Sequence, residues 1–399
     1  MYIVFAVIVC ALVLTIVILA LFLPTPQRIL PVTANLEIAA GSAMSGLASN
    51  RNAFTAITQV GPPLAKMDGG SHQGQHVSVS FDGSTIASSG NGVVIIFNGD
   101  GSYNTMIVVY SYLSTIQAEL SSDGNVCALT CYHNNNYDNP RIYRRKDAKS
   151  DYEYEYGDGS PAYSVAISYD GNTVVYGRFG TDGWVGVLAY NGSAWNEHAR
   201  LVASNQLSTG IEQGTLVNLS GDGNTLISSR SNNDNNNGCV WTFNRSRQNT
   251  WSETGKLLAP YITNGNQGNH IAISGNGLTL MFTATPIDIS NTGIAYVYIF
   301  DGNQWVLFPG PQDLYSAPYD GPVCISHNGM MFGVARGGSV YIYTSDRVSP
   351  FTLQTTVSVD GLTSESQFGS AVSMNENTLI VGAQTNNYGQ GAIVRYNIV

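Results

Sequence analysis

Histidine pairs and nucleophile motifs are the features of this sequence that could carry out chemistry. His72 and His76 lie four residues apart in SHQGQH, a spacing that can present two imidazoles to one metal ion. The segment offers no further ligand, so we interpret the pair as part of a polar loop. No G-x-S-x-G, Walker A or dinucleotide-binding pattern occurs. The sequence therefore predicts no catalytic, cofactor-binding or metal-binding residue.

The cysteines are dispersed and lack the close pairing typical of zinc sites or disulfide frameworks. Cys127 and Cys131 lie four apart in an expected strand, so we expect two packed thiols on one face. The odd total favours free thiols and a reducing compartment. The five are Cys10, Cys127, Cys131, Cys239 and Cys324.

An acidic turn motif, S-x-D-G-N-T, occurs at Ser168–Thr173 and Ser220–Thr225. It is similar to the Asp-box turn of sialidases, but the glycine and aromatic positions of that box do not follow. A sialidase also needs an arginine cluster and a Tyr–Glu pair, and no motif here requires them. We expect the Asp-Gly and Asn-Gly steps to form type I′ hairpin turns.

These turns belong to a repeat that dominates the chain. A short alternating strand, a turn and a second apolar strand recur at intervals of 41 to 54 residues. Seven copies at this spacing match seven four-stranded blades of a β-propeller. The turn residues are Asp82, Asp123, Asp170, Asp222, Asn276, Asn328 and Asn375.

The seventh copy ends at Val399, one strand short of a blade. The segment 54–64 (FTAITQVGPPL) precedes the first copy and is similar to the fourth strands of the other copies. We expect it to close the ring by pairing with the C-terminal blade, which removes two exposed sheet edges. Residues 52–399 would then form one all-β domain, a seven-bladed propeller of four-stranded antiparallel blades.

The last copy, SQFGSAVSMNENTLIVGAQTNNYGQGAIVRYN, resembles an FG-GAP repeat, the blade unit of integrin-alpha-type propellers. The resemblance rests on Phe368-Gly369, the LIVGA strand and the Gly391-Ala392 step. Some family members bind calcium through an Asp-rich loop. The equivalent loops here, Asn232–Gly238 and Asn386–Gly391, lack the alternating carboxylates that calcium needs. The resemblance implies the fold and no cofactor.

A membrane anchor is predicted at the N-terminus. Residues 3–23 run without a charge, and such a helix of about 31 Å would match the hydrocarbon core of a bilayer. A cleaved signal peptide is the alternative, but the basic start and cleavage site are missing. We therefore divide the chain into an anchor (1–23), a stalk (24–51) and the propeller. Arg28, just after the span, favours a cytosolic propeller.

Charge excludes general nucleic-acid binding, because the net charge is −10 with 17 Lys and Arg. The basic stretch 141–149 leads into DYEYEYGDG, and we expect a solvated loop there.

Taken together, these features predict a non-catalytic, single-pass membrane protein. Its propeller would bind protein partners at a cell surface, in a scaffold, or in a virion as a minor capsid protein between membrane and capsid. Membrane lipid would contact residues 3–23. A propeller glycoside hydrolase or sialidase-like enzyme is the alternative.

Overall fold

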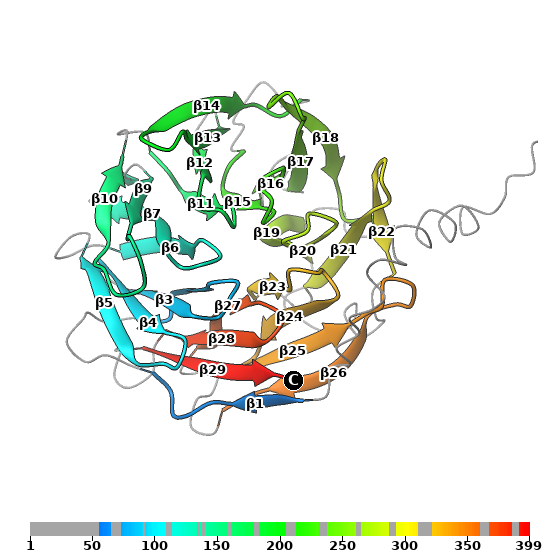
Figure 1. The fold of residues 1–399 in the computed structure, drawn as a ribbon. Coiled ribbons are helices and arrows are strands. Elements are labelled where there is room, and N and C mark those ends of the chain that lie inside the picture. Colours follow the sequence, from blue (N-terminus) through cyan, green and yellow to red (C-terminus); the bar gives the residue numbers. More distant parts are fainter. Residues whose placement is uncertain are drawn as a thin grey trace, which may run out of the picture. The chain divides into compact units, whose positions relative to one another are not determined.

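The alternation of short strands and tight turns produces seven antiparallel sheets arranged around an axis (Figure 1). The structure is a computed structural model that describes residues 56–64, 73–90, 92–108, 114–133, 136–137, 140–157, 161–178, 183–204, 213–230, 238–260, 265–286, 293–309, 321–359, 367–384 and 391–399. They belong to one unit, Phe54–Val399. The seven-bladed, four-stranded architecture predicted from the turn spacing is confirmed.

Each blade runs from an inner strand at the axis to an outer strand at the rim. The inner strands are β2 (His76–Val79), β6 (Ser114–Leu120), β11 (Ser164–Ile167), β15 (Leu216–Leu219), β19 (Gly265–Ile273), β23 (Val323–Ile325) and β27 (Phe368–Met374). The second strands are β3 (Thr85–Gly90), β7 (Val126–His133), β12 (Thr173–Arg178), β16 (Thr225–Arg230), β20 (Thr279–Pro286), β24 (Met331–Arg336) and β28 (Thr378–Ala383).

The third strands are β4 (Val93–Asn98), β9 (Arg141–Arg144), β13 (Trp184–Tyr190), β17 (Cys239–Arg245), β21 (Ile294–Phe300), β25 (Ser339–Thr344) and β29 (Ala392–Ile398). The outer strands are β5 (Tyr103–Val108), β10 (Glu153–Tyr156), β14 (Trp195–Leu201), β18 (Trp251–Leu257), β22 (Trp305–Phe308), β26 (Thr352–Val357) and β1 (Ile57–Gln59). A two-residue strand, β8 (Asn136–Tyr137), adds to β7 in the second blade.

The seventh blade is assembled from both parts of the domain. β1 pairs antiparallel with β29, placing Ile57 opposite Ile398 and Gln59 opposite Tyr396. A further bridge joins Leu64 to Ile393. The N-terminal side of the domain thus supplies the outer strand of a blade whose other strands are C-terminal.

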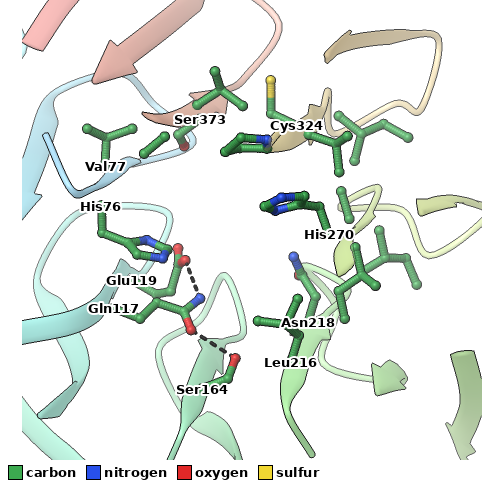
Figure 2. Close-up of a pocket in the computed structure, with 18 of the residues that line it drawn as sticks. His76, Val77, Gln117, Glu119, Ser164, Leu216, Asn218, His270, Cys324 and Ser373 are labelled. Atoms are coloured by element: carbon green, nitrogen blue, oxygen red, sulfur yellow. Dashed lines mark hydrogen bonds between the residues drawn. The ribbon is translucent and has the colours of Figure 1, made fainter. Parts of the chain in front are cut away.

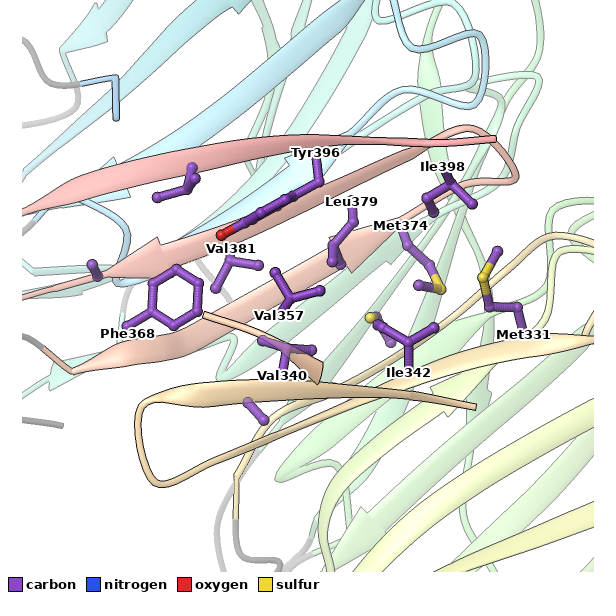
Figure 3. Close-up of a cluster of buried hydrophobic side chains, with 14 residues drawn as sticks. Met331, Val340, Ile342, Val357, Phe368, Met374, Leu379, Val381, Tyr396 and Ile398 are labelled. Atoms are coloured by element: carbon purple, nitrogen blue, oxygen red, sulfur yellow. The ribbon is translucent and has the colours of Figure 1, made fainter. Parts of the chain in front are cut away.

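The hydrophobic core lies between adjacent blades. Figure 3 shows one such cluster, where Val340 and Ile342 of the sixth blade meet Leu379 and Val381 of the seventh. All four are fully buried. Both faces of the middle strands are covered in this way, so strands such as β28 are buried at every residue.

The hairpin turns differ from the predicted type I′ form, which needs positive φ at two successive residues. In each of the first six copies five residues lie between the inner and second strands, and only the glycine is left-handed, with φ between +65° and +70°. The acidic residue acts through its side chain. Asp82 Oδ1 accepts bonds from Ser80 Oγ at 2.7 Å and from the Ser84 amide at 2.9 Å.

The basic stretch 141–149 is not the solvated loop we expected. Its first part is β9, and Ile142 is fully buried. Arg144 pairs with Glu155 on β10 at 3.0 Å. Arg145 is also buried and donates to Thr85 of the first blade at 2.8 Å. The repeat requires a third strand here, and bonding to partners offsets the cost of burying the charges.

The anchor and stalk predicted at residues 1–51 lie outside the described residues. Within the part of the chain that the structure describes, no helix is long and apolar enough to cross a membrane.

Candidate functional site

The inner strands enclose a cavity of about 320 Å³ on the axis of the ring, and all seven blades contribute to its lining. This volume is at the lower end of the range for small-molecule sites. Figure 2 shows Glu119 and His76 on one side of the space and Asn218 and His270 on the other.

A relay of hydrogen bonds positions the carboxylate of Glu119. Gln117 Oε1 accepts from Ser164 Oγ at 2.9 Å and from the Val165 amide at 3.0 Å. Because a backbone N–H can only donate, the amide orientation of Gln117 is fixed, and its Nε2 donates to Glu119 at 2.9 Å. The relay crosses from the second blade to the third (Figure 2).

The cavity changes the proton affinity of two of its side chains. Burial raises the pKa of Glu119 to about 7, while bonds from Gln117 and Ser78 lower it by less. Burial, followed by the charge of His270, lowers the pKa of His76 to about 4. At neutral pH His76 is therefore uncharged and Glu119 is partly ionised.

Three aromatic side chains meet at the end of the axis where the hairpin turns lie. Phe81, Tyr169 and His327 come from the first, third and sixth blades, and their ring centroids are 4.8 to 5.1 Å apart. Since these blades are spread around the ring, side chains that touch must cross the axis. We call these three residues the aromatic plug.

Glycines at two neighbouring blades make room for the aromatic plug. A Cβ atom at Gly221 would lie 2.5 Å from the Tyr169 ring. A Cβ atom at Gly275 would overlap both His327 and Tyr169. Tyr169 and His327 of the plug therefore lie against the bare backbone of the fourth and fifth blades at the turn end.

Hydrogen bonds also link every neighbouring pair of blades at the turn end. Tyr169 donates its amide proton to Gly221 O, and Gly221 donates to Gly275 O, each at 2.8 Å. The seventh copy has a shorter turn, and Asn375 Nδ2 completes the circle by donating to Ser80 O at 3.0 Å. Asn375 thus accepts amide protons within its own turn, as Ser80 and Asp82 do in the first copy.

Hydrolytic machinery is not assembled in this cavity. Glu119 is the only carboxylate among its described lining residues, and none of those residues is arginine or lysine. A glycosidase uses two carboxyl groups on either side of the scissile bond. The described residues also contain no group of three His, Cys, Asp or Glu that could hold a metal ion.

The sequence-based hypotheses fall in different places. His76 lines the cavity, but His72 lies outside the described residues, as do the two loops compared with calcium sites except for Gly238 and Gly391. Cys127, Cys239 and Cys324 are buried. Our sequence reasoning missed Glu119, although it is the acidic residue in the first strand of the copy AELSSDG.

Comparisons with known proteins establish the fold alone. No protein-family model and no curated protein matches the chain, so the resemblance to FG-GAP repeats gains no support from them. Among solved structures, the chain is similar to Kuenenia stuttgartiensis hydrazine synthase, with a TM-score of 0.59 and 14% identity. The match covers 84% of this chain and 98% of the other. At this identity the similarity shows a shared propeller fold.

Proposed function

We propose that this protein is a membrane-tethered, non-catalytic propeller that serves as a protein-binding or structural module. The observation that carries the proposal is the cavity lining, whose described residues include one carboxylate and neither a second carboxyl group nor an arginine. A rigid ring held by interblade bonds is suited to presenting loops to a partner. The uncharged segment 3–23 supports the tether.

The name of the structural neighbour does not favour an enzyme here. Hydrazine synthase shares 14% identity with this chain, and chemistry depends on specific residues that a fold does not carry. The alternative of a glycoside hydrolase predicts turnover that depends on Glu119, the one cavity carboxylate among the described residues.

Crosslinking of the full-length protein in its native membrane tests the proposal. We expect stoichiometric capture of a protein partner from a scaffold, a cell surface or a capsid shell, and protection of the N-terminal segment by lipid. Hydrolysis of glycoside substrates by the wild-type protein but not by Glu119→Gln would overturn it.

A further inference from the structure

The central cavity holds a carboxylate and no fixed positive charge among its described lining residues. We propose that this cavity is a binding site for a small alkylammonium ion, recognised by Glu119. The inference does not depend on the function proposed above, because it concerns a ligand on the axis and not a partner at the rim.

Glu119 is prepared to accept hydrogen bonds from a ligand. Gln117 Nε2 donates to Oε1, and Ser78 Oγ also bonds the carboxylate. Ser78 Oγ itself accepts from the Leu120 amide at 3.2 Å, which leaves its proton for Glu119. These neutral donors orient the carboxylate without neutralising it. A carboxylate has about four lone-pair sites, so acceptor capacity remains for an ammonium group.

Charge selects a cation over an anion. An enclosed carboxylate without a counter-ion is costly to ionise, and a cationic ligand offsets that cost. An anion would meet repulsion from Glu119, and the whole chain carries a net charge of −10. His76, whose pKa is lowered to about 4, adds no positive charge at neutral pH, and His270 lies on the opposite side of the cavity from Glu119 (Figure 2).

The shape and chemistry of the walls favour an organic cation. Leu216, Val323 and Val372 give the cavity apolar surface that suits an alkyl chain. A divalent metal ion is less suited to the site, because the described residues contain no group of three His, Cys, Asp or Glu that could hold one.

Calorimetric titration of the full chain in detergent, with butylammonium as the probe, tests the site. Butanol and butyrate serve as neutral and anionic probes of similar size. We expect butylammonium to bind at least about tenfold more tightly than either, and Glu119→Gln to remove that difference. Glu153→Gln, the same change on the outer strand of the same blade, should bind like the wild type. A titration with Nα-acetyl-lysine amide then distinguishes two sources of the ammonium group. Tighter binding of this compound than of butylammonium would indicate a partner's lysine side chain, and weaker binding would indicate a free amine.

Affinity for butylammonium should also rise with pH up to about 7 as Glu119 ionises, and should not do so in Glu119→Gln. The other titratable groups facing this region are His76 on β2, His270 on β19, Cys324 on β23 and Cys127 on β7. Equal binding of butylammonium and butanol, or unchanged binding by Glu119→Gln, would overturn the proposal.

Discussion

The hairpin turns and the inner strands that lead into them differ in how much the copies share. At the turn end, Ser, Asp or Asn, and Gly recur with the same bonds in the first six copies, as in Ser220, Asp222 and Gly223. Inside the cavity, the position occupied by Glu119 is Ser78 in the first blade and Asn218 in the fourth. The turn residues are uniform, and this strand position differs from copy to copy.

The difference reflects what the turns and the cavity positions must do. The turns pack against one another and close the ring, so the first six copies meet similar surroundings and use the same residues. The cavity residues face one shared space. Seven identical side chains there would give the cavity the same charge and shape on every side. A ring of repeats therefore leaves its axis free to acquire a single distinct site.

The turn glycines give the largest expected effect. Gly124 has φ +65°, and a Cβ there would overlap Thr85 of the preceding blade. Gly124→Ala should reduce the free energy of unfolding by about 3 kcal/mol or more, through strain and overpacking. Gly61→Ala is the matched control, because φ is +69° and nothing lies within 4 Å of its Cβ. Equal losses of stability for the two variants in denaturant titrations would show that the contact between Gly124 and the neighbouring blade does not contribute to stability.

The turn serines come next. Ser220 is fully buried, donates to Asp222 and accepts the Thr225 amide proton at 2.9 Å. Ser220→Ala leaves that amide unsatisfied and should cost about 2 kcal/mol. Ser102 makes a similar bond to Asp100 in an exposed turn, so Ser102→Ala should cost less than about 0.5 kcal/mol. The comparison fails if chemical denaturation finds the two variants equally stable.

Two titratable side chains of the cavity should make the stability of the protein depend on pH. The pKa of Glu119 is raised from 4.5 to about 7, so its contribution to stability is complete below pH 4.5 and lost as pH rises to 7. His76, with its pKa lowered from 6.5 to about 4, contributes in the opposite direction, since stability rises from pH 4 to 6.5.

Glu119→Gln should therefore become more stable relative to the wild type between pH 4.5 and 7, by roughly 1–2 kcal/mol because the cavity is partly solvated. Thermal unfolding across this range measures the difference. The exposed control Glu153→Gln should show no such trend, and a flat difference for Glu119→Gln would contradict the burial of this carboxylate.

The aromatic plug gives the smallest effect, although it lies on the axis. Phe81 is 40% exposed and stacks on Tyr169 and His327. Phe81→Ala should cost about 1 kcal/mol, against less than about 0.5 kcal/mol for Val348→Ala, which is 73% exposed. A loss of stability as large as that of Ser220→Ala would show that Phe81 contributes to the core, contrary to its exposed position in the plug.

The sequence by itself determined the architecture, because a blade is built from local signals. Alternating strands and Gly-containing turns are contiguous, and seven copies reinforce one another. The turn type was wrong because an Asp-Gly pair suits more than one hairpin, and the longer loop forms when Ser Oγ and Asp Oδ1 can bond within it. The stretch 141–149 was wrong because its charges were read without the partners that bury them, Glu155 and Thr85 among them.

Only the tertiary structure decided what lies on the axis. Phe81, Tyr169 and His327 are far apart in the chain, and no motif in their own copies marks them as contact residues. Ring closure nevertheless brings them into contact. Glu119 is likewise an ordinary polar residue of an alternating strand until seven strands surround it. Local sequence specifies each blade, but the chemistry of a shared cavity depends on which residues of distant copies face one another.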